Sequence, residues 1–456
     1  MSNLRIALLG SAAAFVVVGA AHAADLPTKK GAPAAEYVKV CKVDGAAGFV
    51  IPGSDTCLKI TGYLTAQIVG GDLSQQYVWA GNGGSSEKAL APGTPTNERN
   101  AIGMMARAEL EFIAKTNTAY GVLTSDIDMQ YNYGSGLDNF GAGVGFIQHA
   151  FVNWAGITAG KANSFFSFFG AGPGWADIFS PDRQTFNQPL LLAYTATFGG
   201  GFSATLSLED PVLAGPSSAV PPYAGSDMQI TANSQYLGQR APDIVGSLDL
   251  KQSWGGAHLA GVAHNVVMTD GFNNLDTWGY AIDGGLKFNL PMLGAGDNIQ
   301  LQGVWTRNAV WYSGIPDGMW DEDGQVNGNG VVMPVGDAYS NLNGTWATPT
   351  AWSLAAISEF HFGPNFSIDP ELSYAELTWS GLNGAMAGAL STDSQSWILG
   401  GVANWSPVPH LDIALEALYQ TTHQSMPAAF SVPAGDVTWK STTDGAETRL
   451  SITRDF

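Results

Sequence analysis

The chain has 456 residues, of which 13% are charged and 45% hydrophobic, and 57 are glycine. Acidic residues outnumber basic ones by 39 to 19, which gives a formal net charge of −20. This balance argues against a nucleic-acid partner, because such partners require basic surface. The hydrophobic content argues against disorder. The length fits either two or three soluble domains or one large barrel.

Residues 1–23 have the pattern of a signal peptide. Arg5 and the amino terminus supply positive charge, residues 6–20 form an apolar core, and Ala21-His22-Ala23 offers small residues at a cleavage site. The apolar core is too short for a membrane anchor, which needs roughly 20 residues. We expect cleavage between Ala23 and Ala24, and therefore an exported protein.

Residues 24–57 precede the first strand pattern, and we expect them to form a periplasmic segment. They begin with a linker rich in Pro, Ala and Lys and contain both cysteines, Cys41 and Cys57. An exported protein meets oxidising conditions, so these cysteines are expected to form a disulfide. Closing so short a loop stabilises by about 3 kcal/mol in the chain-entropy model. Two free thiols are the alternative.

Two stretches at opposite ends of the remaining chain have the same pattern. Residues 58–69 and 446–456 alternate apolar and polar side chains with a period of two, which is typical of a strand with one apolar face. If they pair, the sheet closes and has no edge. A sheet in a lipid bilayer requires closure, since each unpaired backbone group there costs several kcal/mol.

Similar alternation predicts sixteen strands, an even number as in single-chain outer-membrane barrels. They lie near residues 58–69, 100–114, 120–130, 145–154, 156–163, 190–198, 202–209, 243–252, 257–267, 277–290, 297–308, 350–362, 366–377, 395–405, 411–421 and 446–456. Pro370 falls inside one of them and lacks a backbone donor, so we expect a bulge or a broken ladder there. Aromatic residues at strand ends indicate interfacial girdles: Trp154, Trp278, Trp305, Trp352, Phe362, Trp397, Trp405 and Tyr419.

Connections between these strands alternate between short and long. The short ones are rich in Gly, Pro and Asn, as hairpin turns require, and include 115–119, 155–156, 199–201, 254–256, 363–365 and 406–410. The long ones are polar and include 70–99, 210–240 and 309–348. Short turns on one rim and long loops on the other are typical of transmembrane barrels. We expect residues 58–456 to form an all-β, 16-stranded antiparallel transmembrane β-barrel.

The N-terminal motifs resemble the mature start of the alphaproteobacterial outer-membrane porin family. They are Ala24-Asp25-Leu26-Pro27, Lys29-Lys30, Glu36-Tyr37-Val38, Cys41, Ile51-Pro52-Gly53, Asp55-Thr56-Cys57-Leu58 and Gly62-Tyr63. The resemblance implies a homotrimer in the outer membrane of a Gram-negative bacterium, in contact with lipid and lipopolysaccharide. It implies a general diffusion porin, a water-filled channel for small hydrophilic solutes, with no enzymatic activity and no cofactor. It also implies that Phe456 acts as a membrane-insertion signal.

In porins of this kind the third long loop folds inward and narrows the lumen. Here that loop is 164–189, which begins with the aromatic run 164–169. This run would be buried if it packed against the inner wall or a neighbouring subunit. We expect Asp177, Asp182 and Arg183 to lie at the constriction. The alternative for the two acids is an ordinary role in turns.

Opposite the loop we expect charged side chains on the lumen face of the wall. The alternation of faces along each predicted strand gives five lumen-facing cations: Lys59, Arg107, Lys251, Lys287 and Arg449. The acids are Glu109, Glu111, Asp126, Asp128, Asp249, Asp283, Glu359, Asp369, Glu371, Asp412, Glu416 and Glu447. Wall charge raises the local concentration of counter-ions, so the excess of acids predicts a mild cation preference. The residues expected nearest the constriction are Lys59, Arg107, Glu109, Glu111 and Arg449.

Two other readings remain open at this stage. A substrate-selective channel for sugars or another nutrient would use an aromatic slide, which Phe165, Phe166, Phe168 and Phe169 could supply. A secreted all-β glycosidase or lectin would use paired carboxylates such as those of residues 109 and 111. The second reading is weaker, because an enzyme concentrates its acids in one cleft and these are spread over many strands.

Overall fold

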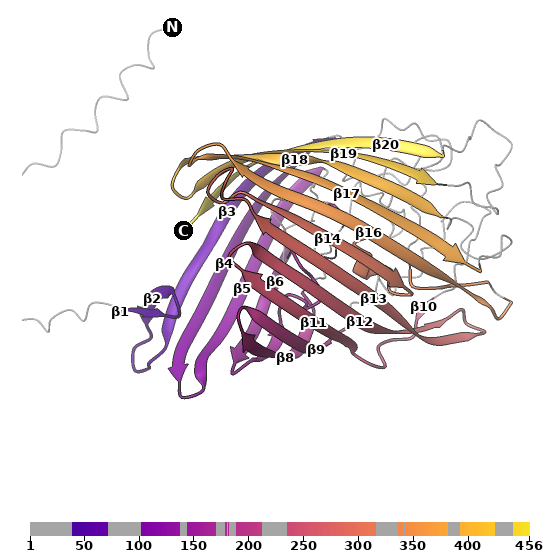
Figure 1. Ribbon diagram of the computed structural model, residues 1–456, viewed down its shortest axis with the longest axis horizontal. Coiled ribbons are helices and arrows are strands. Elements are labelled where there is room, and N and C mark those ends of the chain that lie inside the picture. The colour runs from indigo at the N-terminus through magenta and orange to yellow at the C-terminus, as the bar shows by residue number, and fades with distance from the viewer. Residues whose placement is uncertain are drawn as a thin grey trace, which may run out of the picture. The chain divides into compact units, whose positions relative to one another are not determined.

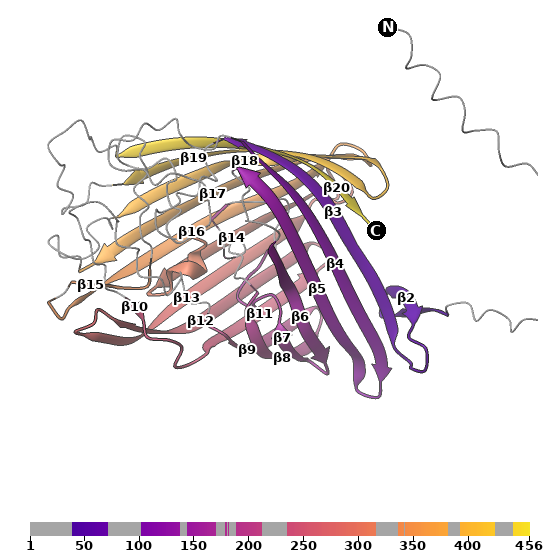
Figure 2. The same ribbon diagram turned by 180° about the vertical axis from the view of Figure 1, so that it is seen from behind.

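Sixteen antiparallel strands form the wall of the computed structural model (Figures 1 and 2). The structure describes residues 39–71, 102–136, 144–169, 178–179, 181, 188–211, 235–315, 336–341, 343–381, 393–424 and 441–456. The chain divides into two units, Met1–Val40 and Cys41–Phe456, and the second contains the wall. The predicted signal peptide and linker lie outside the described residues.

The wall strands match the sixteen predicted ones in position and order. They are β3 (Cys57–Gly71), β4 (Ile102–Thr118), β5 (Gly121–Gly136), β6 (Val144–Trp154), β7 (Ile157–Lys161), β8 (Leu190–Gly199), β9 (Phe202–Glu209), β11 (Asp243–Gln252), β12 (Gly255–Thr269), β13 (Asn274–Asn289), β14 (Asn298–Arg307), β16 (Trp346–His361), β17 (Phe366–Ser380), β18 (Ser394–Val408), β19 (Leu411–Gln424) and β20 (Thr442–Asp455). Short strands outside the wall are β1 (Val40–Val43), β2 (Ala46–Val50), β10 (Gln235–Tyr236) and β15 (Tyr339–Ser340). Among the described residues, no helix is long and apolar enough to cross a membrane.

The first and last wall strands pair and close the sheet, as predicted. The ladder between β20 and β3 runs from Glu447 opposite Gly71 to Asp455 opposite Tyr63. It continues to the last residue, since the Phe456 N–H donates to the Gly62 carbonyl at 3.0 Å. Each wall strand therefore has a neighbour on both sides, and the ladders pair most of the backbone groups that lipid would leave unpaired.

Alternation along the strands separates an apolar outer face from an inner face. On β16, Leu354 is 53% exposed while its neighbour Ala355 is 5% exposed. The predicted aromatic residues lie on the outer face near the two rims. On β18, Trp397 lies near the rim with the long loops and Trp405 near the rim with the short turns, and each is 50% exposed. Eight residues of a tilted strand separate the two girdles by about 20 Å, close to the height of an outer-membrane apolar band.

Two irregularities interrupt the ladders. At Pro370 the β16–β17 ladder stops after Ile357 opposite Glu371 and resumes in the same register at Phe360 opposite Ile368. The predicted broken ladder is confirmed there, without a shift in register. A bulge at Gln148 lies between β5 and β6, because Asp128 pairs with His149 while Met129 pairs with Ile147. The sequence analysis did not predict this bulge.

The N-terminal hairpin is tied to the start of the barrel. β1 and β2 are joined by Asp44 and Gly45, which both have positive φ, as a tight type I′ turn requires. β2 pairs with the start of β3. The predicted disulfide between Cys41 and Cys57 is confirmed, with their Cα atoms 5.8 Å apart.

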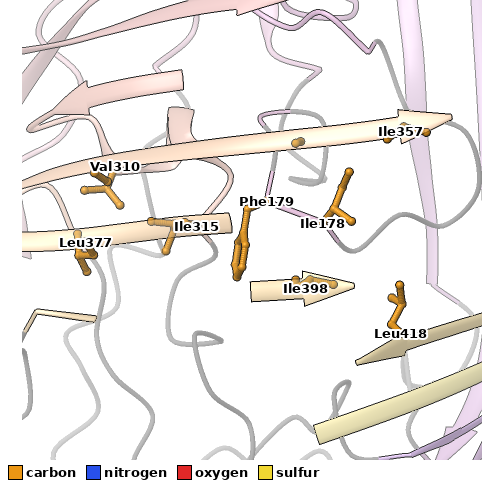
Figure 3. Close-up of a cluster of buried hydrophobic side chains, with 11 residues drawn as sticks. Ile178, Phe179, Val310, Ile315, Ile357, Leu377, Ile398 and Leu418 are labelled. Carbon is orange, nitrogen blue, oxygen red and sulfur yellow. The ribbon is translucent and has the colours of Figure 1, made fainter. Parts of the chain in front are cut away.

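The apolar core of the described chain lies inside the barrel. Its largest cluster joins the third loop, which connects β7 to β8, the sixth loop, which connects β14 to β16, and the wall strands β16–β19. Figure 3 shows this cluster, with Ile178 and Phe179 from the third loop, Val310 and Ile315 from the sixth loop, and Ile357, Leu377, Ile398 and Leu418 from the wall. The interior is therefore partly filled by two inward-folded loops.

The short connection between β12 and β13 is stabilised by a carboxylate. Asp270 accepts hydrogen bonds from the backbone N–H groups of Phe272 and Asn273 at 2.8 and 2.6 Å, and from the Ser340 hydroxyl of the sixth loop. Burial raises the pKa of Asp270, but these hydrogen bonds outweigh it and lower the pKa to about 2. The ionised form is thus favoured in the folded protein.

This pKa gives a testable dependence on pH. The folded-state pKa lies below the unfolded value of about 3.9, so the stabilisation is fully present above about pH 4 and is lost as pH falls through 2. We expect Asp270→Asn to lower the thermal unfolding midpoint in detergent at pH 6, and the difference from wild type to shrink as pH approaches 2. Asp276→Asn is the control, because Asp276 pairs with Arg240 on the exposed rim. A difference independent of pH would contradict this account.

Candidate pore constriction

The third loop leaves the wall after β7 and is held by a buried carboxylate. Glu209, the last residue of β9, is 2% exposed. It accepts a hydrogen bond from the Ser164 hydroxyl at 2.6 Å and from the Phe165 N–H at 3.1 Å. Hydrogen bonds are electrostatically stronger where water is excluded. The start of the loop is therefore fixed to the inner side of the wall.

Phe166 anchors the loop on the inner face of β11–β14. Its side chain is 1% exposed and packs against small and β-branched residues that point inward: Val245, Ala260, Val262, Ala281 and Val304. Its carbonyl lies 3.1 Å from Nε2 of His258, whose Nδ1 lies 2.8 Å from the Asp249 carboxylate. Both partners are acceptors when Asp249 is ionised, so this geometry fits a doubly protonated imidazole ring. The aromatic run packs against the inner wall, which was one of its two expected positions.

Phe168 lies against the wall at Gly285. Its ring stacks on His258 with centroids 5.8 Å apart. A Cβ atom placed on Gly285 would lie 2.2 Å from Cγ of Phe168, a distance that requires the ring to move. The glycine on β13 thus provides the recess that the loop occupies.

A later described part of the loop contacts a different part of the wall. Ile178 and Phe179 are at most 1% exposed and lie in the cluster on β16–β19 (Figure 3). The Phe179 N–H donates to the Ser373 hydroxyl at 2.9 Å. The loop therefore contacts β11–β14 near its start and β16–β19 further along. Its described parts thus lie on the inner face of the wall far from β7, as expected of a loop that narrows a pore.

A polar patch covers the lumen face of β3–β6. Its residues form rows across neighbouring strands: Lys59, Ile113 and Asp126; Thr61, Glu111, Asp128 and His149; Tyr63, Glu109 and Gln130; Thr65, Arg107 and Asn132. The Gln130 amide donates to Glu109 at 2.8 Å and to the Tyr63 hydroxyl at 3.1 Å, and Nε of Arg107 donates to Asn132 at 2.9 Å. We call this set the β3–β6 patch.

The predicted constriction residues fall into three groups. Lys59, Arg107, Glu109 and Glu111 come together in the β3–β6 patch. Arg449 is separate, on β20, where it lies 2.6 Å from Glu447 and 3.7 Å from Glu416. Asp177, Asp182 and Arg183 lie outside the described residues, so their predicted positions stay predictions.

Sequence reasoning missed His149, a member of the patch, and Gln148, which contacts the patch. The bulge lets Gln148 and His149 face the lumen in succession, where Gln148 donates to Gln130 at 3.2 Å and His149 lies 3.8 Å from Asp128. Both hydrophilic side chains stood next to each other in an otherwise alternating strand, which is the only sequence signal for the bulge. Among the residues that the structure describes, no group of three or more His, Cys, Asp or Glu is placed to hold a metal ion.

A closed sixteen-stranded barrel with a loop across its lumen and charged side chains on its inner wall is a membrane channel of the porin type. The comparison with protein families agrees: residues 25–448 match the family described as the porin subfamily, and the chain belongs to it. The protein is an outer-membrane porin.

Relatives and solved structures point the same way. The chain is 28% identical over 391 residues to Porin Omp2b of Brucella suis biovar 1 (strain 1330), which covers 82% of this chain and 93% of the relative. Identity and coverage are the same for Porin Omp2b of Brucella canis. The outer membrane channel DcaP of Acinetobacter baumannii has a similar fold, with a TM-score of 0.56 at 12% identity over 90% of this chain and 99% of that chain.

The recess at Gly285 can be tested by a matched pair of substitutions. Gly285→Ala should destabilise the barrel by roughly 1–3 kcal/mol, because the new methyl group overlaps the Phe168 ring. Gly284→Ala on the same strand faces outward with nothing within 4 Å of the new Cβ, and should be neutral or stabilising. Urea unfolding in detergent, followed by tryptophan fluorescence, measures both. Equal effects would show that the loop does not occupy the recess.

Proposed function

We propose that this porin allows passive diffusion of small hydrophilic solutes with a mild preference for cations, and that the β3–β6 patch sets this preference. The observation that carries the proposal is the accessibility of its acids. Glu109, Glu111 and Asp126 are partly exposed on the lumen face. A solvated carboxylate on the wall of a low-dielectric channel raises the local concentration of cations.

Most other lumen-facing acids contribute little to this field. Several are 5% exposed or less, so an ion in the lumen does not reach them: Asp283, Asp369, Glu371, Glu416 and Glu447. Asp283 accepts a hydrogen bond from Gln302 at 2.6 Å, and Arg449 lies against two of the acids. Lys59 and Arg107 partly offset the patch, which keeps the expected preference mild.

The third loop is proposed to form the other side of the constriction. We propose that Asp177 and Asp182 face the lumen from the third loop, with Arg183 beside them. Support comes from the described segments of the same loop, since Phe166 packs on β11–β14 and Phe179 on β16–β19. A loop attached to the inner face in this way would bring its charged side chains close to the path of a solute.

An aromatic slide for one substrate has less support. The Phe166 ring is buried against β11–β14, and the Phe168 ring lies on Gly285 and His258. Rings used as loop anchors in this way are not available to stack on a passing sugar. The glycosidase reading has less support too, because the family members matched here are channels and Glu109 is hydrogen-bonded within the wall.

We propose that the protein works as a homotrimer. β7 has five residues, whereas a tilted strand needs about 9–11 to span a bilayer. The chain turns into the lumen after β7, so the wall is low there, and a neighbouring barrel would shield it from lipid. Chemical cross-linking of the detergent-extracted protein, with trimers resolved by mass, tests this assembly.

The remaining assignments concern export and position. We propose that residues 1–23 are removed near Ala23 and Ala24, that residues 24–57 lie on the periplasmic side, and that residues 58–456 form the pore in contact with lipid and lipopolysaccharide. The short-turn rim also carries the disulfide and the terminal Phe456. Phe456 is proposed as the insertion signal of the barrel.

The preference for cations can be measured as a reversal potential in a planar bilayer under a salt gradient. The wild type should give a cation-directed potential, and Glu109→Gln with Glu111→Gln should lower the cation-to-anion permeability ratio by about twofold. Asp276→Asn removes one acid at the exposed rim and should leave the ratio unchanged. An anion-directed wild-type potential, or an unchanged ratio in the double variant, would contradict the role of the patch.

A further inference from the structure

The sixth loop folds into the barrel at both of its described ends. After β14 the chain forms η2 (Val310–Ser313), in which Val310, Trp311 and Ser313 are buried, and Ile315 behind it is 0% exposed. Residues 337–341, which precede β16, are at most 6% exposed. Val310 and Ile315 of the first end pack on inward-facing residues of β16–β19, and Ala338 of the second end packs on Val266 and Met268 of β12.

A buried charged cluster holds these two ends. His264 on β12 places Nδ1 2.8 Å from the Asp243 carboxylate of β11 and Nε2 3.4 Å from the Asp337 carboxylate of the sixth loop. The three residues are 0–1% exposed. An imidazole ring between two carboxylates balances charge best when both nitrogens carry protons. We call Asp243, His264 and Asp337 the sixth-loop anchor.

Tyrosines and a backbone amide complete the anchor. The Tyr312 hydroxyl of η2 donates to Asp243 at 2.5 Å, and the Tyr236 hydroxyl of β10 donates to Asp337 at 2.5 Å. The Val310 N–H donates to the other Asp337 oxygen at 2.8 Å. Asp337 therefore joins the two ends of the sixth loop to each other, and Asp243 and His264 join them to the wall.

The anchor is adjacent to the attachment of the third loop. Asp243 pairs across the strands with Glu209, which holds Ser164 and Phe165. The Phe166 and Tyr312 rings contact edge to face with centroids 4.8 Å apart. Ile178 and Phe179 of the third loop pack in one cluster with Val310 and Ile315 of the sixth (Figure 3). The sixth loop thus covers the side chains that hold the third loop on the wall.

We propose that the two described ends of the sixth loop, residues 308–315 and 336–341, form a second element of the constriction, and that His264 is a positioning residue for both loops. Its imidazole keeps the sixth loop folded on the inner wall, and the sixth loop in turn keeps the third loop across the lumen. Because the three anchor residues are buried, they act on permeation through loop position and not through their own field in the pore. The inference rests on the channel function, but it is independent of the cation preference proposed above.

Single-channel recording tests the anchor. His264→Gln and Asp337→Asn each break it, and each should raise conductance about 1.5-fold or more, because loops released from the wall constrict the lumen less. Both should also admit larger polyethylene glycols in polymer-exclusion measurements. The double variant should match the single ones, since all three remove one shared interaction.

His361→Gln is the matched control. It makes the same substitution at a histidine that also faces an aspartate, Asp297 at 3.2 Å, but near the short-turn rim. Its conductance should equal that of the wild type. Migration of the unheated protein on gels confirms that each barrel is folded. If the anchor variants do not fold, Tyr312→Phe, which removes one hydroxyl and leaves the ion pairs, should raise conductance in the same direction.

Unchanged or lower conductance in folded anchor variants overturns the proposal. A cation-directed wild-type potential together with that result would leave the patch intact and refute only the role of the sixth loop. Raised conductance in His361→Gln as well would also overturn it, because the effect would then come from losing any histidine–aspartate pair.

Discussion

The requirement that every backbone N–H and C=O be paired within the hydrocarbon layer determines the rest of this structure. It forces the sheet to close, and β20 meets β3 through a ladder that ends at the last residue. A closed sheet of sixteen strands encloses more space than wall side chains can fill. Two connections enter that space, and their exposed backbone and apolar side chains must find partners there. Glu209 and Asp337 supply such partners for the third and sixth loops.

Most of the wall could be predicted because its signals are local. A period of two determines which side chains face lipid, and Gly, Pro and Asn mark the hairpins. These signals located all sixteen strands, the pairing of the first and last strands, and the interruption at Pro370. The disulfide was predictable for a similar reason, since two cysteines near one strand start in an exported chain have few other partners.

The loop attachments could not be predicted, because they join residues that only the closed barrel brings together. Ser164 and Glu209 are 45 residues apart, and Tyr312 and Asp243 are 69 apart. Parity correctly placed Asp283 and Glu416 on the lumen side, yet it carries no information about what covers them. The bulge at Gln148 was missed because a single extra residue changes the face of each residue after it, and only the partner strand shows where the change occurs.

Burial divides the inner acids of this barrel between two tasks. Glu209, Asp243 and Asp337 are at most 2% exposed and are surrounded by donors, so they order loops and add little to the potential in the lumen. Glu109 and Glu111, in contrast, lie on β4 and remain partly exposed to solvent. A carboxylate in contact with water acts on passing ions, whereas one enclosed by donors acts on the groups that touch it. The net charge of −20 therefore overstates the charge that a solute meets, and the pore field follows from the acids that stay in contact with water.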